Sequence, residues 1–238
     1  MNINKSSQQM DLPAYQRIVE GDLYLNPKEC ARRDSDFVSM LQTFFQYKRL
    51  VAETIWELKK DQKVLQVGVV NGSEMDEVAM AVGAYGQYDI VDVNPTQADR
   101  VTEKYWKLYQ NMKVYKKNMV DIEDSAEYDA VICFMVLSEV PSQTKSQIIN
   151  KALQMVKVGG KVIFTDWHNP EEYHPLRYIV RMYNRLYHPF VERLWDRNIV
   201  SYAKPEYRNK FEWKKDTYFG RMFQKTVAVK KEEFDSNP

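Results

Sequence analysis

The sequence predicts an α/β fold with a doubly wound, mostly parallel sheet. Between residues 63 and 166, short apolar runs rich in β-branched residues alternate with amphipathic runs long enough to form helices. The run from Tyr128 to Met135 is almost continuously apolar, as expected of a central strand covered on both faces. Sheets of this type bind ligands at the carboxyl ends of their strands, so the functional residues are expected at that edge.

Composition narrows the class of protein. At 238 residues the chain fits one large domain or one domain with appendages. The formal net charge of +1 argues against a nucleic-acid-binding protein. Cys30 and Cys133 form no CxxC pattern, so a disulfide framework is not expected. A reducing compartment is the expected environment. The sequence has no apolar run of about 18 residues and no signal-peptide core, so neither a membrane-spanning helix nor an export leader is expected.

A helical cap is expected ahead of the sheet. Apolar residues recur at three- and four-residue spacings from Leu12 to Leu58, so residues 1–62 are predicted to form a cap and residues 63–238 the main domain. Packing on the sheet is the simpler interpretation of this cap; the alternative is that Tyr15 or Tyr24 closes over a bound ligand. Residues 1–9 and 230–238 are expected to be disordered.

The first predicted strand, residues 63–69, leads into a turn that contains Gly68 and Gly72, and a helix is predicted over residues 74–82. Ser73, with Asp76 three residues later, is a helix-start signature. Glycines allow a ligand to approach the backbone closely, and the first N–H groups of the helix are expected to point at that ligand.

The second predicted strand ends at Asp92, which lies 20 residues after Gly72. An acid at this spacing is where a nucleoside ribose is hydrogen-bonded, although a helix cap or a loop acid would also explain it. The remaining elements are predicted from the same alternation. They are a helix over residues 96–109, strands over 113–117, 128–135 and 161–166, and a helix over 142–156 that ends at Gly159 and Gly160.

This order resembles the class I S-adenosylmethionine (SAM)-dependent methyltransferases. That resemblance implies a Rossmann-like, seven-stranded, mostly parallel sheet, an antiparallel C-terminal hairpin over residues 211–230, and SAM as cofactor. Val70 stands where the family has the middle glycine of its first motif, so weaker SAM binding is expected. The resemblance places the cofactor against Val67, Gly68, Val69, Asn71, Gly72, Asp92, Val93, Asn118, Met119 and Phe134.

Segments later in the chain resemble the rhodoquinone-biosynthesis family RquA. They are residues 166–170, 174–177, 189–190 with 194–195, and 217–220 with 224–225. This resemblance implies that SAM is an amino donor to a lipophilic quinone (ubiquinone), with a divalent metal such as manganese, Mn²⁺. Three segments depart from that pattern: residues 69–72 read Val-Val-Asn-Gly, Ser138 replaces a histidine, and His188 replaces the glutamate before Pro189 and Phe190. An ordinary methyltransferase on a small aromatic acceptor, or a non-catalytic SAM- or lipid-binding protein, therefore stays open.

Asp166, His168 and His174 follow the last parallel strand and are the predicted metal ligands. The same three residues, with Glu139 after the fourth strand, are the candidate catalytic residues. The alternative for His168 is a hydrogen bond within its own loop.

Residues 169–211 are too long for a simple connection and are predicted to form a helical lid or substrate insertion. A stripe of arginines in this segment, Arg177, Arg181 and Arg185, lies beside a stripe of apolar and aromatic residues. This pattern favours binding at a membrane surface, through the arginines and through Tyr183, Tyr187, Phe190 and Trp195. A packed helix with a solvated basic face is the alternative, and no nucleic acid is expected as partner. The expected location is cytoplasmic, at the inner membrane, or the mitochondrial matrix side in a eukaryote.

Overall fold

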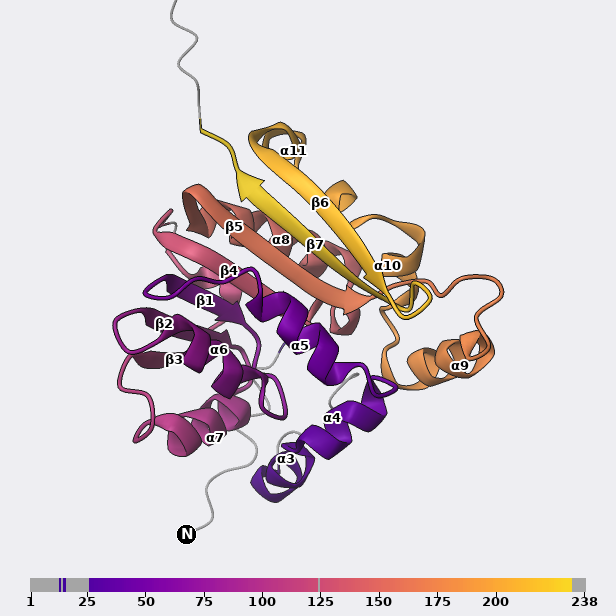
Figure 1. Ribbon diagram of the computed structural model, residues 1–238, viewed down its shortest axis with the longest axis horizontal. Helices are drawn as coiled ribbons and strands as arrows, with labels where there is room; N and C mark the ends of the chain where they lie inside the picture. Colours follow the sequence, from indigo (N-terminus) through magenta and orange to yellow (C-terminus); the bar gives the residue numbers. More distant parts are fainter. Residues whose placement is uncertain (1–12, 14, 16–25, 124, 233–238) are drawn as a thin grey trace, which may run out of the picture.

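The computed structural model describes residues 13, 15, 26–123 and 125–232. Its centre is a seven-stranded sheet with the strand order β3-β2-β1-β4-β5-β7-β6 (Figure 1). The first five strands are parallel, and β7 runs antiparallel between β5 and β6. The strands are β1 Lys63–Val67, β2 Gln87–Asp92, β3 Met112–Lys116, β4 Tyr128–Phe134, β5 Val156–Trp167, β6 Phe211–Tyr218 and β7 Phe223–Lys230.

Helices cover both faces of the sheet, so the predicted doubly wound fold is confirmed. One core contains side chains of α5, α6 and α7, and the other contains side chains of α8 and α10. The helices of the parallel half and of the N-terminal region are α3 Pro27–Arg33, α4 Asp36–Gln42, α5 Tyr47–Ile55, α6 Glu74–Val82, α7 Pro95–Tyr105 and α8 Ser142–Met155. Short 3₁₀ turns follow β3 and β4, namely η2 Met119–Asp121 and η3 Leu137–Glu139.

Strand β4 shows why the sheet is buried on both faces. Ile132 and Phe134 belong to one core and Val131 and Cys133 to the other, because successive side chains of a strand point to opposite faces. All four are at most 2% exposed. The continuous apolar run therefore fills two cores at once, as its sequence predicted.

The N-terminal helical region is broken where a continuous helical pattern was predicted. Helix α3 ends at Arg33, and a new helix, α4, begins after Ser35, whose side chain caps it by accepting a hydrogen bond from the N–H of Phe37. Phe44 and Phe45 both have positive φ angles, so α4 cannot run on into α5. Tyr24, residues 1–9 and residues 233–238, for which sequence-based expectations were stated, lie outside the described residues.

The last parallel strand is longer than predicted. Gly159 and Gly160 were expected to end the preceding helix, but they lie inside β5, which begins at Val156. The register against β4 shifts between Tyr128↔Val156 and Ala130↔Lys161, so this stretch is an irregular extension of the strand. The two glycines therefore accommodate a bulge rather than a helix end.

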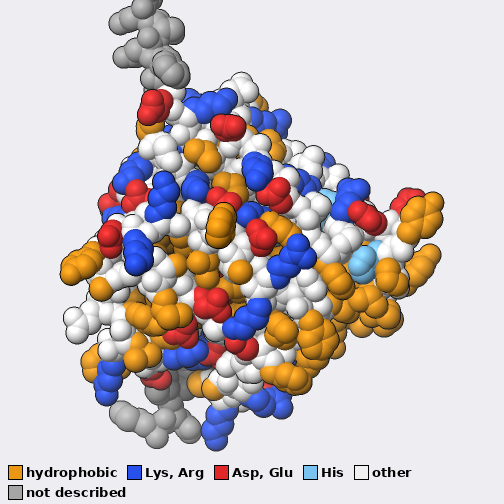
Figure 2. Space-filling view, in the orientation of Figure 1, with side chains coloured by type: hydrophobic (Ala, Val, Ile, Leu, Met, Phe, Trp, Pro, Cys, Tyr) orange, Lys and Arg blue, Asp and Glu red, His pale blue; other side chains and the backbone are white. Residues whose placement is uncertain are grey.

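The connection before the C-terminal hairpin is helical, as predicted. Figure 2 shows hydrophobic side chains gathered over its first helix, α9, on the right of the view. No described helix has the length and apolarity needed to cross a bilayer. The hairpin turns through Phe219, Gly220 and Arg221, all with positive φ, where the turn was predicted. The elements of the connection are α9 Arg177–Tyr187, α10 Glu192–Asp196, η4 Ile199–Tyr202 and α11 Pro205–Lys210.

Candidate functional site

A cavity of about 230 Å³ lies at the carboxyl ends of β1, β2 and β4, the edge of the sheet where the sequence placed the functional residues. Two groups of residues line it. One group follows the ends of the strands, and it includes nine of the ten residues predicted to hold the cofactor: Val67, Gly68, Val69, Asn71, Asp92, Val93, Asn118, Met119 and Phe134. The other group comes from the N-terminal helices, the end of β5 and the insertion, among them Gln42, Thr43, Tyr47, Trp167, Tyr183, Tyr187 and His188.

Asp92, the last residue of β2, connects the end of β2 to the turn after β1 through hydrogen bonds of its carboxylate. One carboxylate oxygen accepts a hydrogen bond from the N–H of Val69, and the other accepts from the N–H of Asn94, both at 2.6 Å. Burial raises the pKa of Asp92 to about 6, although these two bonds and the charge of Arg100 act to lower it. Each oxygen has a further lone pair, so the carboxylate can still accept hydrogen bonds from a ligand in the cavity.

The two glycines of the first turn have different roles. Gly68 has a φ of 83° and lines the cavity, and a Cβ there would lie 2.9 Å from Val136. Gly72, the tenth predicted cofactor residue, is not part of the cavity lining. A Cβ on it would lie 2.7 Å from the Tyr47 hydroxyl and 2.9 Å from Asp36. Gly72 therefore allows the N-terminal helices, rather than a ligand, to approach the backbone.

Val70 lines the cavity and is not among the described residues with a positive φ, so the backbone at this position does not require a glycine. The Val70 side chain still occupies space in the cavity lining, and the weaker cofactor binding expected from it stays a prediction. Tyr15, one of the two tyrosines considered as a cover for a ligand, also lines the cavity.

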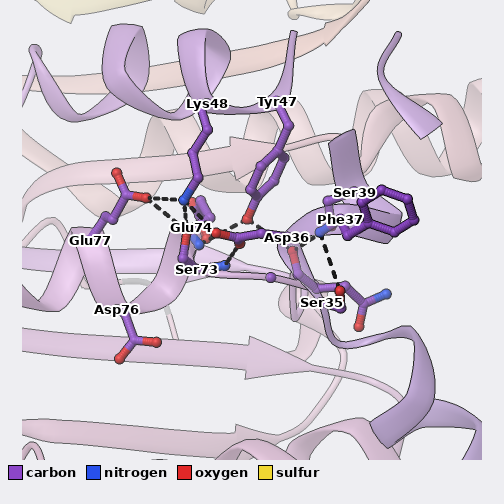
Figure 3. Close-up of polar contacts among 12 residues, drawn as sticks. Ser35, Asp36, Phe37, Ser39, Tyr47, Lys48, Ser73, Glu74, Asp76 and Glu77 are labelled. Carbon is purple, nitrogen blue, oxygen red and sulfur yellow. Dashed lines mark hydrogen bonds and ion pairs between the residues drawn. The ribbon is translucent and has the colours of Figure 1, made fainter. Parts of the chain in front are cut away.

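Three side chains from the N-terminal region hold the turn that precedes α6, and Figure 3 labels two of them, Asp36 and Tyr47. Asp34 accepts a hydrogen bond from the N–H of Gly72 at 2.8 Å, and Asp36 accepts one from the N–H of Ser73 at 2.7 Å. The Tyr47 hydroxyl donates to the carbonyl of Asn71 and accepts from the N–H of Glu74, both at 2.9 Å. The first N–H groups of α6 are therefore bonded to protein side chains.

The helix begins where the sequence predicted, at Glu74 with Ser73 as its N-cap residue, although the Ser73 side chain contacts Glu77 at 2.7 Å and makes no capping bond. One prediction is corrected. The N–H groups of Ser73 and Glu74 do not point at a ligand, because Asp36 and Tyr47 accept their hydrogen bonds. A helix N-terminus satisfied in this way does not offer the anion site that phosphate-bearing cofactors use.

A buried polar network lies behind the turn. Gln66 donates from its amide nitrogen to Glu74 at 2.8 Å, and its amide oxygen accepts from the hydroxyl of Tyr88. Glu74 is fully buried, and burial raises its pKa to about 8, so its carboxyl group is largely protonated at neutral pH. The neutral amide of Gln66 places no charge beside the buried carboxyl group of Glu74.

Aromatic rings form the other end of the cavity. Trp167, at the end of β5, lies 6.1 Å from Tyr183 and 5.8 Å from His188, measured between ring centroids. Phe44 stands edge-on to both Trp167 and Tyr183, at 6.3 and 5.8 Å. These contacts join the N-terminal helices, the sheet and the insertion around one apolar space.

Two polar groups face this aromatic end. Nδ1 of His188 has no hydrogen-bond partner among the described residues, and burial lowers the pKa of this histidine to about 4. The ring is therefore neutral at physiological pH and can accept or donate a hydrogen bond. Glu139, one of the predicted catalytic residues, also lines the cavity from η3.

Asp166 lies at the end of β5, but it is fully buried and does not line the cavity. One of its oxygens accepts hydrogen bonds from the N–H groups of Leu137 at 2.8 Å and Ser138 at 3.2 Å. The other oxygen accepts from the N–H of Trp167 at 2.7 Å. Burial raises the pKa of Asp166 to about 6. Its contacts fix the turn that carries Glu139, so its role in the structure is to position that turn.

The two histidines predicted beside Asp166 do not lie in the cavity lining either. Nδ1 of His168 contacts the carbonyls of Asn169 and Arg221, each at 3.1 Å, and its Nε2 lies 2.9 Å from the Lys215 ammonium. Nδ1 of His174 accepts from the N–H of Leu176 at 3.2 Å. The alternative interpretation of His168, hydrogen bonding within its own loop, holds for the contact with Asn169, and the other two contacts go to the C-terminal hairpin.

These contacts correct the predicted metal site. Asp166 is occupied by three backbone N–H groups, and both ring nitrogens of His168 already have partners. Within residues 13, 15, 26–123 and 125–232, no group of three His, Cys, Asp or Glu side chains could hold a metal ion. The donor set at Asp166, His168 and His174 therefore does not fit Mn²⁺.

The fold agrees with the comparisons to known proteins. A family model described as a methyltransferase domain matches residues 64–160. The N-methyltransferase NodS from Bradyrhizobium japonicum WM9, solved with S-adenosyl-L-homocysteine, aligns with a TM-score of 0.61 at 11% identity, over 92% of this chain and 100% of its own. A SAM-dependent methyltransferase from Aquifex aeolicus aligns with a TM-score of 0.55 at 16% identity, over 86% and 98%. The chain has the class I methyltransferase fold. No curated protein matches the sequence.

Proposed function

We propose that this protein is a SAM-dependent transferase that acts on a lipophilic, quinone-like aromatic acceptor. The observation that supports this function is the composition of the cavity. Its strand-end half has Gly68, Asp92 and Asn118, and its other half is walled by Trp167 and Tyr183. A cofactor and an apolar ring bound in these two halves would meet inside one space.

In this proposal the strand-end half binds SAM. Asp92 accepts hydrogen bonds from the ribose hydroxyls, Asn118 and Met119 lie beside the adenine, and the turn from Gly68 to Asn71 lies against the amino-acid part. SAM carries no phosphate, so it needs no free helix N-terminus. The bonds from Asp34 and Asp36 to the start of α6 are compatible with SAM for this reason.

The aromatic half holds the acceptor. A planar ring can pack against the aromatic wall that Trp167 and Tyr183 form, and His188 can hydrogen-bond an oxygen on that ring. SAM supplies an electrophilic methyl group on a positively charged sulfur. A neutral His188 suits this chemistry, because a cationic ring in an apolar cavity would repel the sulfonium. In the transfer, the acceptor oxygen gains the methyl group and releases its proton toward His188, and S-adenosyl-L-homocysteine is formed.

The resemblance to the RquA family leaves amino transfer to a quinone as the competing reaction. That resemblance implies a divalent metal, and the side chains that were expected to bind it do not converge. We therefore favour methyl transfer to a hydroxyl of a reduced quinone or a related phenol.

The test is to incubate the purified protein with SAM and a short-chain quinol, with and without manganese, and to record mass spectra of the quinone fraction. An added methyl group with formation of S-adenosyl-L-homocysteine, independent of manganese, is the expected result. Replacement of a methoxy group by an amino group would overturn methyl transfer in favour of amino transfer. An unchanged quinone with SAM still bound would overturn catalysis on this class of acceptor, and Trp167→Ala serves as the control with a damaged acceptor half.

A further inference from the structure

Helix α9 presents an apolar surface to solvent. Its residues Val180 and Asn184 are buried against the protein, whereas the opposite side is exposed. The exposed side carries large apolar side chains, each at least half exposed: Tyr178, Ile179, Met182, Leu186 and Tyr187. A helix with this pattern normally buries such a face against something.

Helix α4 and the residues after it extend the same surface. Phe37, Leu41 and Phe45 are each at least half exposed. The two helices meet through Phe44 and Tyr183, whose ring centroids lie 5.8 Å apart. Figure 2 shows hydrophobic side chains gathered at the lower right, where Figure 1 places α4 and α9. We call these eight exposed residues, three from α4 and its end and five from α9, the α4–α9 face.

The α4–α9 face surrounds one side of the cavity. Gln42 and Thr43, at the end of α4, line the cavity, and so do Tyr183 and Tyr187 of α9. Tyr187 both lines the cavity and is exposed to solvent, so it stands at the mouth. The aromatic half of the cavity therefore opens beside the apolar face.

The charged residues of α9 are all cationic: the helix contains Arg177, Arg181 and Arg185 and no acidic residue. The acidic residue of α4, Asp36, is partly exposed, but it is paired with Lys48 and accepts a hydrogen bond from the N–H of Ser73. Glu192 and Asp196 of α10 lie beside Arg181, Met182 and Arg185, so carboxylates are present at one margin of the face. The α4–α9 face itself is uncharged, and the cationic charge of its longer helix, α9, is complementary to an anionic bilayer.

The residues that form this face differ from those expected. Trp195 is partly buried, with Arg181 over its ring at 5.8 Å, and Tyr183 faces the cavity. Arg185 is exposed, whereas Arg177 and Arg181 are partly buried. The helix thus presents Ile179, Met182 and Leu186 outward, while part of the aromatic stripe builds the acceptor half.

We infer that the α4–α9 face binds the surface of an anionic lipid bilayer, with the mouth of the cavity turned toward the lipid. A lipophilic acceptor could then enter the aromatic half from the bilayer without crossing water. The identity of the acceptor rests on the function proposed above, whereas membrane binding is measured independently of it.

The test is co-sedimentation of the full chain with vesicles of phosphatidylcholine alone and with vesicles that also contain phosphatidylglycerol. The double variant Met182→Asp/Leu186→Asp should bind the anionic vesicles at least tenfold more weakly, because two apolar side chains no longer enter the interface. Arg185→Glu should weaken binding about fivefold or more and reduce its dependence on salt. The matched control is Leu108→Asp, since Leu108 is 66% exposed against 69% for Leu186 but follows α7, away from this face.

Binding to anionic vesicles that the double variant loses and Leu108→Asp retains would support the inference. Equal sedimentation of both variants would overturn it, as would no sedimentation of the unmodified chain. Light scattering in the absence of lipid provides a further check. A dimer that Met182→Asp/Leu186→Asp converts to a monomer would show that a second copy, not a bilayer, covers the face. Calorimetric binding of SAM to each variant separates a failure of this inference from a failure of the proposed function.

Discussion

The carboxylate of Asp36 accepts a hydrogen bond from the backbone N–H of Ser73 at 2.7 Å, although 37 positions separate the two residues. The same carboxylate pairs with Lys48 at 2.5 Å (Figure 3). Through these contacts a side chain of α4 caps α6 and fixes the end of the turn that lines the cavity. These contacts join the N-terminal helices to the strand-end half of the cavity.

Asp36→Ala should lower the free energy of unfolding by about 1–2 kcal/mol, the usual cost of losing a helix cap. Hydrogen bonds from Lys48 and Ser73 hold the pKa of Asp36 below its ordinary value, against the opposing effect of burial. The loss should therefore be complete at neutral pH and should shrink as the pH falls through the pKa of Asp36. Chemical denaturation measures this loss of stability. The control is Asp99→Ala, which removes the ion pair with Lys116, a pair in which both side chains are half exposed. This control should lower the free energy of unfolding by under about 1 kcal/mol. Equal losses for the two variants would contradict the capping role.

Glu74→Gln should change the pH dependence of stability. The pKa of Glu74 is about 8 in the folded protein against an ordinary value of 4.5, because the carboxyl group is buried. Between these values the folded protein keeps a proton that the unfolded chain releases, so the stability of the unmodified protein falls as pH rises, by up to about 1.4 kcal/mol per pH unit. Urea denaturation across this pH range should show that the variant becomes more stable relative to the unmodified chain as the pH increases. Parallel stability curves would mean that Glu74 is ionised in the folded state.

His188→Phe should slow transfer at least tenfold and leave the affinity for SAM within about twofold, since a hydrogen bond to a reacting group commonly contributes about 1–3 kcal/mol. Phenylalanine retains the ring contacts with Trp167 and Tyr183 but has no ring nitrogen. The matched control is His174→Asn, which keeps an acceptor for the N–H of Leu176 outside the cavity and should retain the full rate. A fast His188→Phe enzyme would remove His188 from the mechanism and leave only its packing role.

The affinity for SAM should itself depend on pH. Burial raises the pKa of Asp92 to about 6, and a protonated carboxyl group accepts hydrogen bonds from hydroxyl groups less well than a carboxylate. Binding should therefore weaken as the pH falls below about 6 and should level off above about 7. Titrations at several pH values check this. A pH-independent affinity would show that Asp92 does not face the ligand in its charged form.

The fold was predictable because each parallel strand has a recognisable local sequence pattern, a short apolar run followed by turn residues. The run around Ile132 fills two cores, and Gly68 lies in the turn after β1, so the alternation of strands and helices along the chain follows from the hydrophobic pattern and the turn residues. The seven-stranded arrangement came from the resemblance to methyltransferases. The boundaries were less accurate where tertiary contacts decide them. Gly159 and Gly160 resemble a helix end, but pairing with β4 draws them into β5.

The strand-end half of the site was predictable for the same reason, and the rest was not. Tyr47 reaches Asn71 and Glu74 across more than twenty positions, and His188 meets Trp167 only because α9 folds back over the sheet. No local pattern signals such contacts. The metal prediction failed because proximity in sequence does not set the direction of a side chain: the ring of His168 turns to the carbonyl of Arg221 instead of joining Asp166.

The most direct test of the central claim, that the strand-end half binds SAM, is isothermal titration of SAM into the unmodified chain and into Asp92→Ala. We predict a single site in the unmodified chain and an affinity lowered roughly ten- to a hundredfold in the variant, since a charge-assisted hydrogen bond contributes about 1.5–3 kcal/mol. Asp92→Asn, which keeps one acceptor oxygen, should fall between the two, and thermal melting should show that all three are folded. No heat of binding to the unmodified chain, or equal affinities for folded Asp92→Ala and the unmodified chain, would contradict the account.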